Sequence, residues 1–466
     1  MANPGTADEP LRVAIVGAGP SAFYAADHLL KQPGLNVEVD MFDRLPTPYG
    51  LVRFGVAPDH QKIKTVTRSF AETAASPHFR FYGAVEFGRD ITLDEIRAHY
   101  HQVLFATGAQ TDRRMGIPGE DLHGSHPATS FVAWYNGHPD YRDCQFDLSH
   151  ERAVVVGVGN VAIDVARILC LTPGELMASD MAPHAVEALS VSRIREVHVL
   201  GRRGPAQAAF TTPEIKEFGA LSDVDVIVRP EEAALDPLSR AFVDGASDRP
   251  LSRKIELIQA YAAQKPAGHS RRVFFRFLVS PVELLDDGAG SVGGVRVVRN
   301  VLKVSGSGSL AAEPTEEFET IAAGLVLRSV GYRGVALPDV PFHDRWGVIL
   351  NERGRVLDPD SQTAIAGEYV TGWIKRGPSG VIGTNKPDSV ETVTAMLEDA
   401  GAGRTFVPAA PEVEAAETLV RTRQPRCITF EDWRRLDALE LEAGERCGRP
   451  RVKFTSVDEM LAALGR

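Results

Sequence analysis

Residues 13–22, VAIVGAGPSA, decide the fold class of this chain, because they join a strand pattern to a glycine-rich turn. An apolar, β-branched run leads into G-x-G-x-x-A, and an amphipathic helix pattern follows to about Lys31. In such a turn Gly17 permits the tight bend, Gly19 lets the backbone approach a pyrophosphate, and Ala22 lets helix and strand pack closely. The pattern is typical of a dinucleotide-binding unit, in which the phosphates lie at the start of the helix.

A second copy of the pattern starts 140 residues after the first, at position 153 against position 13. Residues 153–162, AVVVGVGNVA, again lead from an apolar strand into G-x-G-x-x-A, and the following helix is predicted to end near Pro173. Two copies indicate two dinucleotide sites rather than a tandem repeat array.

The residues that follow the two copies differ in charge. Asp43 ends the predicted second strand of the first copy, where an acid receives the ribose hydroxyls. In the second copy, the strand 196–200 ends in Arg202 and Arg203, and two guanidinium groups suit a 2′-phosphate. This favours FAD at the first site and NADP(H) at the second, with hydride transfer between them, although a solvated Arg-Arg turn is the alternative. The long spacing in the second copy predicts an insertion over residues 171–192.

Composition and charge exclude several other classes of protein. The 466 residues include 51 Lys and Arg against 62 Asp and Glu, a net charge of −11, which disfavours binding to nucleic acid or to an anionic membrane. No apolar stretch approaches the ~18 residues of a membrane span, and residues 1–10 resemble neither a signal nor a transit peptide. We therefore expect no stable membrane insertion and a cytoplasmic location. The four cysteines form no C-x-x-C pair, which argues against a redox dithiol and a thiolate-rich metal site, and we expect no metal.

The fold class predicted from these patterns is α/β, with two Rossmann-like dinucleotide-binding domains and the NADP domain inserted into the FAD domain. We expect the FAD domain over residues 1–111 and 333–466, ending in a C-terminal helical tail, and the NADP domain over 112–332. Further predicted elements are a helix over 65–75, strands over 103–108, 196–200, 223–228 and 325–330, an antiparallel meander over 273–304, a helix over 388–399 started by Asp388 and Glu391, and one or two C-terminal helices anchored by Trp433.

Five longer sequence strings indicate a particular family more specifically than the two glycine turns do. The chain resembles the adrenodoxin-reductase-like ferredoxin–NADP reductases, in particular their bacterial FprA type, from residue 13 to about 400 and again at 448–454. The strings that carry the resemblance are LPTPYGLVR (45–53), GVAPDH (55–60), GRRGP (201–205), AFTTPE (209–214) and GWIKRGPSGVIGTNK (372–386). The chain departs from the family pattern at Val158, where Asn is common, at Asp43, where Glu is commoner, and at Tyr49, where Trp is frequent.

The resemblance implies an FAD-dependent enzyme that moves electrons between NADPH and a ferredoxin-type iron–sulfur protein, which could feed cytochromes P450. It implies that His60 and Glu214 lie near the flavin and nicotinamide and position the cofactor or move protons. By the same resemblance and the glycine motif, FAD is expected at Gly17, Gly19, Ser21, Asp43, Leu51, Val85, Trp373, Gly380, Val381 and Ile382. NADP(H) is expected at Arg113, Gly157, Gly159, Asn160, Val161, Ala162, Arg202, Arg203, Glu214 and Gly380.

A basic stretch over residues 249–276 gives this acidic chain a candidate surface for a charged partner. Seven basic residues stand there against one acid, Glu256. Arg249 and Arg253 resemble the family's docking arginines for the iron–sulfur protein, while a merely solvated face is the alternative. Two other functions remain open from the sequence: an NADPH-dependent flavin oxidoreductase acting on a small-molecule acceptor, and a nucleotide-binding module without catalysis.

Overall fold

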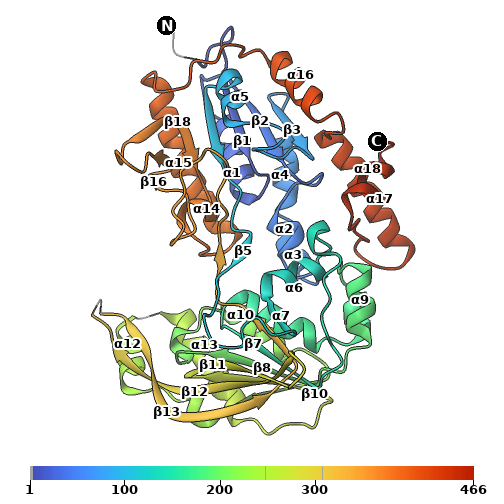
Figure 1. The fold of residues 1–466 in the computed structure, drawn as a ribbon, viewed down its shortest axis with the longest axis vertical. Coiled ribbons are helices and arrows are strands. Elements are labelled where there is room, and N and C mark those ends of the chain that lie inside the picture. Colours follow the sequence, from blue (N-terminus) through green and yellow to red (C-terminus); the bar gives the residue numbers. More distant parts are fainter. Residues whose placement is uncertain (1–3, 247, 307) are drawn as a thin grey trace. The chain divides into compact units, whose positions relative to one another are not determined.

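A computed structural model of the chain describes residues 4–246, 248–306 and 308–466 (Figure 1). The chain forms two compact units. The first extends to Thr111 and continues over Asn136–Pro139 and Gly331–Arg466, and the second comprises Asp112–Tyr135 and Asp140–Val330. The second unit is therefore an insertion in the first.

The first unit contains a mostly parallel sheet. Its strands are β1 (Leu11–Val16), β2 (Val37–Asp43), β3 (Phe79–Gly83), β4 (Gln102–Phe105), β16 (Asn351–Glu352), β17 (Arg355–Leu357) and β18 (Ala364–Val370). They are ordered β16-β17-β18-β4-β1-β2-β3. The five strands from β18 to β3 are parallel, and β16 and β17 extend the sheet as antiparallel neighbours. The apolar run of the first glycine motif is thus the central strand β1, which is buried throughout.

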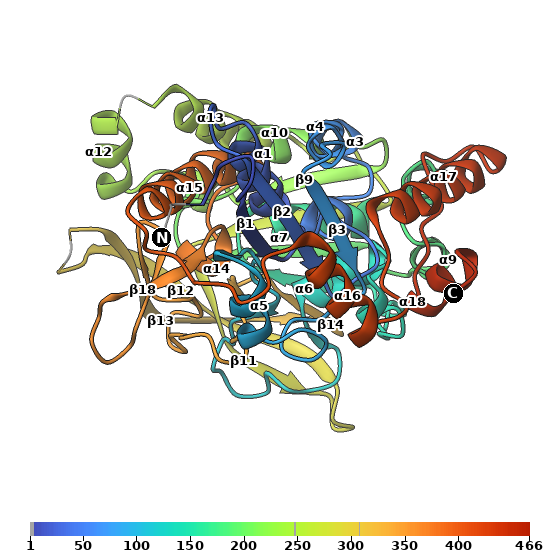
Figure 2. The same cartoon turned by 90° about the horizontal axis from the view of Figure 1, so that it is seen from above.

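Helices cover both faces of this sheet (Figure 2). The helices are α1 (Pro20–Leu30), α2 (Leu51–Phe54), α3 (Gln61–Lys64), α4 (Thr67–Ala74), α5 (Leu93–His99), α14 (Trp373–Arg376), α15 (Asn385–Gly401), α16 (Val413–Arg423), α17 (Phe430–Arg446), α18 (Val457–Ala463) and the 3₁₀ turn η3 (Ile382–Thr384). Phe23 of α1 and Met396 of α15 share one core, and Ile96 of α5 and Val420 of α16 belong to the core on the other face.

The second unit contains a six-stranded parallel sheet. Its strands are β6 (Ser125–Pro127), β7 (Arg152–Val156), β8 (Glu196–Gly201), β9 (Val224–Val228), β10 (Arg271–Phe277) and β14 (Leu325–Arg328), in the order β6-β14-β7-β8-β10-β9. An antiparallel sheet of β11 (Val279–Asp286), β12 (Val292–Val304) and β13 (Leu310–Ala322) accompanies it. Val154 of β7 and Val297 of β12 share one core cluster, so the antiparallel sheet packs against one face of the parallel sheet.

The opposite face of this parallel sheet is covered by helices. The second unit contains α6 (Ala128–Tyr135), α7 (Asn160–Cys170), α8 (Pro173–Met177), α9 (Pro183–Ser190), α10 (Thr212–Phe218), α11 (Pro230–Ala233), α12 (Pro237–Ala246), α13 (Arg249–Ala263) and the 3₁₀ turn η2 (Pro205–Gln207). Ile163 of α7, Ile215 of α10 and Ile258 of α13 are fully buried in the same core. Two short strands, β5 (Thr111–Asp112) and β15 (Tyr332–Arg333), and the 3₁₀ turn η1 (Pro139–Tyr141) complete the elements. The predicted fold class, two Rossmann-like α/β domains with one inserted into the other, is confirmed.

Three local predictions differ from the structure. The segment 273–277 is not part of an antiparallel meander, because it belongs to β10, which pairs in parallel with β8 and β9. Asp388 does not start a helix, since α15 begins at Asn385. The C-terminal region contains three helices rather than one or two, and Trp433 of α17 is buried as predicted. Within the described ranges, no helix is both long and apolar enough to cross a membrane.

Candidate dinucleotide sites

The first glycine turn has a closed side and an open side. Gly17 has a φ of +103°, and a Cβ at this position would lie 2.6 Å from the carbonyl oxygen of Ala106, so only glycine fits. At Gly19 no heavy atom lies within 4 Å of an added Cβ. The open space adjoins the start of α1, where unpaired N–H groups and the helix dipole favour an anion. The turn therefore fits the pyrophosphate of a dinucleotide.

Asp43 ties the end of β2 to this turn. Its Oδ2 accepts a hydrogen bond from the Ala18 N–H and its Oδ1 accepts one from the Leu45 N–H, both at 2.9 Å. Each carboxylate oxygen keeps a further lone pair for a ribose hydroxyl. Burial raises the pKa of Asp43. The Val85 side chain lies in the core, and its backbone N–H donates to the Asp43 carbonyl oxygen at 2.9 Å, next to the end of β2.

A loop from the 45–53 string lies against the glycine turn. The Tyr49 N–H donates to the Ala18 carbonyl oxygen at 2.8 Å. A Cβ at Gly50 would lie 3.0 Å from the Gly19 Cα, so the two backbones are in close contact. Leu51 starts α2 next to this contact and is half-buried. The string thus forms one wall of the first site.

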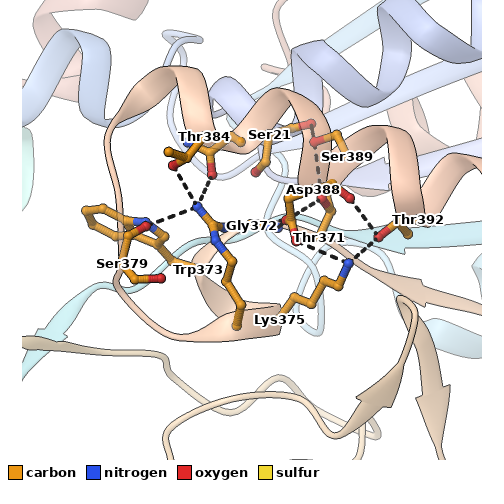
Figure 3. A network of polar contacts seen from close by, with 12 residues as sticks. Ser21, Thr371, Gly372, Trp373, Lys375, Ser379, Thr384, Asp388, Ser389 and Thr392 are labelled. Atoms are coloured by element: carbon orange, nitrogen blue, oxygen red, sulfur yellow. Dashed lines mark hydrogen bonds and ion pairs between the residues drawn. The ribbon is translucent and has the colours of Figure 1, made fainter. Parts of the chain in front are cut away.

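A polar network centred on Asp388 forms a second wall (Figure 3). Its Oδ2 accepts hydrogen bonds from the Gly372 N–H at 2.7 Å and the Thr371 hydroxyl at 3.1 Å. The buried Lys375 ammonium lies 3.1 Å from the other oxygen of this carboxylate. A Cβ at Gly372 would lie 2.5 Å from the Ser21 Oγ, so this turn adjoins the start of α1.

The loop over residues 377–384 is fastened to the same network. The Trp373 indole N–H donates to the Ser379 carbonyl oxygen at 3.1 Å (Figure 3). The Arg376 Nη2 donates to the same oxygen at 3.1 Å and to the Asn385 Oδ1 at 3.0 Å. Within this loop Gly380 has a φ of +79° and is exposed, as is Val381. Ile382 is half-buried. Ser21, Trp373 and residues 380–382 thus belong to one neighbourhood of the first unit.

The sequence patterns missed the residues that hold this neighbourhood together. The sequence pattern predicts only a helix start for Asp388 and no role for Arg376, although both follow the Gly372 turn closely. The string 372–386 signalled that the segment matters, but only its folded geometry links Asp388 to Gly372 and Arg376 to Ser379.

The second glycine turn repeats the geometry of the first. Gly157 has a φ of +132°, and a Cβ there would lie 2.2 Å from the carbonyl oxygen of Ser329. No heavy atom lies within 4 Å of a Cβ added at Gly159. Helix α7 begins directly afterwards, with Asn160, Val161 and the buried Ala162 in its first turn. This turn also fits a pyrophosphate.

Asn160 connects the turn to Glu214. The Asn160 Nδ2 donates to the Glu214 Oε1 at 3.1 Å, and the Asn160 Oδ1 accepts a hydrogen bond from the Thr211 N–H at 3.0 Å. The Thr211 hydroxyl donates to the other Glu214 oxygen. Glu214 lies in the first turn of α10, so its carboxylate joins that helix to the start of α7.

Two arginines, Arg202 and Arg203, follow the end of β8. Arg202 is exposed and Arg203 is half-buried, and among the residues that the structure describes neither guanidinium pairs with an acid. Burial, and then the charge of Arg202, lowers the pKa of Arg203. A 2′-phosphate would neutralise this repulsion and accept bidentate hydrogen bonds, so the pair fits NADP(H). Arg113 is also exposed.

The basic stretch over 249–276 does not form one surface. Lys254 is buried, with its ammonium 2.5 Å from the Ala208 carbonyl oxygen, and Arg276 is buried in ion pairs with Glu232 and Glu319. Arg271 and Arg272 lie near Asp223 and Glu196, respectively. Arg249 and Arg253 are exposed on α13, and neither has an ion-pair partner in the described part of the chain.

His60 and Glu214 belong to different units. His60 immediately precedes α3 in the first unit, is half-buried, and donates its backbone N–H to the Ala57 carbonyl oxygen at 3.0 Å. Glu214 lies in α10 of the second unit.

Comparison with known proteins places this geometry in a family. The pyridine nucleotide-disulphide oxidoreductase family matches residues 11–218. The chain is 46% identical to NADPH-ferredoxin reductase FprA of Mycobacterium tuberculosis, over 97% of this chain and 98% of that protein. It is 40% identical to human mitochondrial NADPH:adrenodoxin oxidoreductase, over 99% of this chain and 93% of that protein. The chain belongs to the adrenodoxin-reductase-like ferredoxin–NADP reductases.

A solved structure agrees with this family. The structure of Mycobacterium tuberculosis FprA in complex with NADPH matches with a TM-score of 0.89 at 45% identity, and the match covers 98% of this chain and all of the other. As a ferredoxin–NADP reductase, the chain is an FAD- and NADP-dependent oxidoreductase that transfers electrons between NADPH and a ferredoxin-type protein.

Proposed function

We propose that the first unit of this ferredoxin–NADP reductase holds FAD and that the second unit binds NADPH through Arg202 and Arg203. The observation that carries this assignment is the contrast between the two glycine turns. The first is followed by the acid Asp43, and the second by two guanidiniums that pair with no acid in the described part of the chain. A ribose diol suits the first and a 2′-phosphate suits the second.

The residues of each site divide the work of binding and orientation. The open sides of Gly19 and Gly159 admit the two pyrophosphates, and the starts of α1 and α7 supply N–H donors. Asp388 and Arg376 hold the loop over 377–384, so that its exposed Gly380 can approach the FAD of the first unit. When bound, FAD supplies the conversion between hydride transfer and single-electron transfer, which no side chain of the protein can perform.

We assign His60 and Glu214 to positioning the coenzyme and moving protons. An imidazole changes its charge near neutral pH, which suits proton movement. Glu214 accepts hydrogen bonds from Asn160 and Thr211, so it also fixes the start of the α7 helix. Removal of this carboxylate would loosen the second glycine turn.

Arg249 and Arg253 are proposed as the docking point for the ferredoxin. They are four residues apart on α13 and therefore share one helix face. Their charges, which pair with no acid among the residues that the structure describes, suit an acidic partner, and opposite charges increase the rate of encounter.

The experiment reverses both charges with Arg249→Glu and Arg253→Glu in the FAD-loaded enzyme. Ferredoxin-dependent cytochrome c reduction at low salt should fall on the order of tenfold or more, because steered association depends steeply on charge. NADPH-dependent ferricyanide reduction should stay within about twofold, because the small acceptor needs no docking surface. Arg434→Glu with Arg435→Glu, on exposed positions of α17, makes the same change in net charge and should leave both rates unaltered.

Equal losses in both assays would contradict the docking assignment, and cytochrome c reduction that is equally fast without added ferredoxin would favour a small-molecule acceptor. We also propose that the reduced ferredoxin feeds cytochromes P450, on the family resemblance, and that the enzyme works in the cytoplasm. The four unpaired cysteines support a reducing compartment. Reconstitution with the ferredoxin and a P450 from the same cell tests the first of these two proposals, and cell fractionation tests the second.

A further inference from the structure

Asn300 lies behind the Arg202–Arg203 turn and bonds directly to its backbone. This residue of β12 is 2% exposed. Its Nδ2 donates one hydrogen bond to the Arg202 carbonyl oxygen and one to the Ser280 Oγ, both at 2.8 Å. The Asn300 amide therefore uses both of its N–H donors. Without its hydrogen bond the Arg202 carbonyl oxygen would carry a desolvation cost, so this bond fixes the backbone of the turn.

The Arg203 carbonyl oxygen, next in the turn, also accepts a hydrogen bond from the segment that leads into the antiparallel sheet. The Leu278 N–H donates to the Arg203 carbonyl oxygen at 3.1 Å, and the Asn300 N–H donates to the Leu278 carbonyl oxygen at 2.7 Å. Leu278 forms the corner between β10 and β11 with a φ of +57°, a conformation that leucine rarely adopts. The register of β12 against β13 shifts next to Asn300, between Val298 and Asn300. An irregular strand and a strained corner therefore meet at the arginine turn.

We propose that Asn300 is a positioning residue for coenzyme choice, which holds the Arg202–Arg203 backbone so that both guanidiniums face one 2′-phosphate. This inference rests on the assignment of that turn to the 2′-phosphate under the proposed function. Two like charges repel each other, so the Arg202 and Arg203 side chains would separate into solvent if the backbone were free. Fixing the backbone beforehand removes an ordering cost that binding of the phosphate would otherwise have to meet.

A positioning role and a merely structural role predict different results. If Asn300 only stabilises the sheet, its removal changes the stability of the second unit and affects NADPH and NADH equally. If Asn300 positions the arginines, its removal weakens the binding of only those ligands that carry the 2′-phosphate. The hydride-donating end of the two coenzymes is identical, so kcat should not change.

The test compares Asn300→Ala with Ser280→Ala in the FAD-loaded enzyme. Ser280→Ala is the matched control, because it removes one partner of the Asn300 amide and leaves the bond to Arg202. The readouts are KM and kcat for NADPH and NADH in ferricyanide reduction, calorimetric Kd values for 2′,5′-ADP and 5′-AMP, and the thermal midpoint.

For Asn300→Ala we expect KM for NADPH and Kd for 2′,5′-ADP to rise about tenfold, the equivalent of one lost hydrogen bond. KM for NADH and Kd for 5′-AMP should stay within about twofold, as should all four values in Ser280→Ala. Parallel changes for both coenzymes, or no change for either in a folded Asn300→Ala variant, would overturn the inference. If Asn300→Ala does not fold, Asn300→Leu provides the same comparison, because it fills the space of the amide and carries no donor, and its NADPH and NADH values decide in the same way.

Arg202→Ala, measured in parallel, separates this inference from the proposed function. If Arg202→Ala weakens NADPH and NADH equally, the 2′-phosphate assignment fails and the inference fails with it. If Arg202→Ala weakens NADPH alone while Asn300→Ala spares it, only the role of Asn300 is refuted.

Discussion

Replacing Glu440 with glutamine should destabilise the first unit strongly, although Glu440 carries no part of the chemistry. The carboxylate of this α17 residue is 1% exposed. Its two oxygens accept hydrogen bonds from the Arg53 guanidinium at 2.5 and 2.8 Å, from the Arg451 Nη1 at 2.9 Å and from the Phe454 N–H at 2.8 Å. Glu440 therefore joins the 45–53 string, which lies against the first glycine turn, to the C-terminal string 448–454.

The magnitude follows from the burial of the partner that would remain. The Arg53 side chain is 4% exposed, and removing one member of a buried ion pair costs about 3–5 kcal/mol. Glu442→Gln on the same helix is the control, because its side chain is 56% exposed and its pair with Arg446 contributes at most about 1 kcal/mol. Since Arg53 also lies 5.1 Å from the Trp433 ring, loss of the pair should change the packing of that ring.

The assay is urea denaturation at pH 7, followed by tryptophan fluorescence and by release of FAD. Glu440→Gln should lower the free energy of unfolding by about 3–5 kcal/mol and release FAD at lower urea. Although burial opposes its ionisation, Arg53 and Arg451 hold the pKa of Glu440 below its usual value. The wild type therefore keeps this contribution above the ordinary pKa of 4.5 and loses it as the pH falls below that value, so the difference between the two proteins should shrink in acid. A Glu440→Gln variant no less stable than Glu442→Gln would refute the reasoning.

Two other predictions concern the second unit. Gly159→Val should weaken NADP(H) binding on the order of tenfold or more with little loss of stability, because its φ of −100° admits valine and the added atoms enter the open space assigned to the pyrophosphate. Calorimetry with NADP+ checks this. Gly157→Val would collide with Ser329 and should fail to fold. Burial lowers the pKa of His198 from 6.5 to about 4, so the unfolded chain takes up a proton in that range that the native protein does not. The stability of the second unit should therefore fall between pH 6.5 and 4, and fall less in His198→Gln, as measured by urea midpoints at pH 7 and 4.5.

The parts of the fold that the sequence predicts are those with a local cause. Gly17 and Gly157 have φ values of +103° and +132° next to a carbonyl oxygen, and only glycine is tolerated there. The apolar run before each turn must be a buried strand, as β1 and β7 are. Because each requirement involves only neighbouring residues, it produces a sequence motif from which the local structure can be predicted.

The parts that sequence reasoning missed depend on distant partners. The two-residue periodicity of β10 does not distinguish a parallel from an antiparallel strand, and its neighbours β8 and β9 decide. Asp388 resembles a helix start until Gly372 is brought to its carboxylate. Lys254 and Arg276 belong to a basic stretch in the sequence but are buried in the fold. Lys254 donates to the Ala208 carbonyl oxygen and Arg276 to Glu232, and no local sequence pattern predicts these contacts.

The most direct test of the account is anaerobic reduction of the FAD-loaded protein, followed by the visible absorbance of the flavin. Equal concentrations of NADPH and NADH are mixed with the wild type and with the Arg202→Ala, Arg203→Ala double variant. The account predicts that NADPH bleaches the wild-type flavin much faster than NADH does, and that the double variant loses this preference because NADPH slows while NADH does not. A flavin that NADPH leaves oxidised, or a preference for NADPH that survives the loss of both arginines, would contradict it.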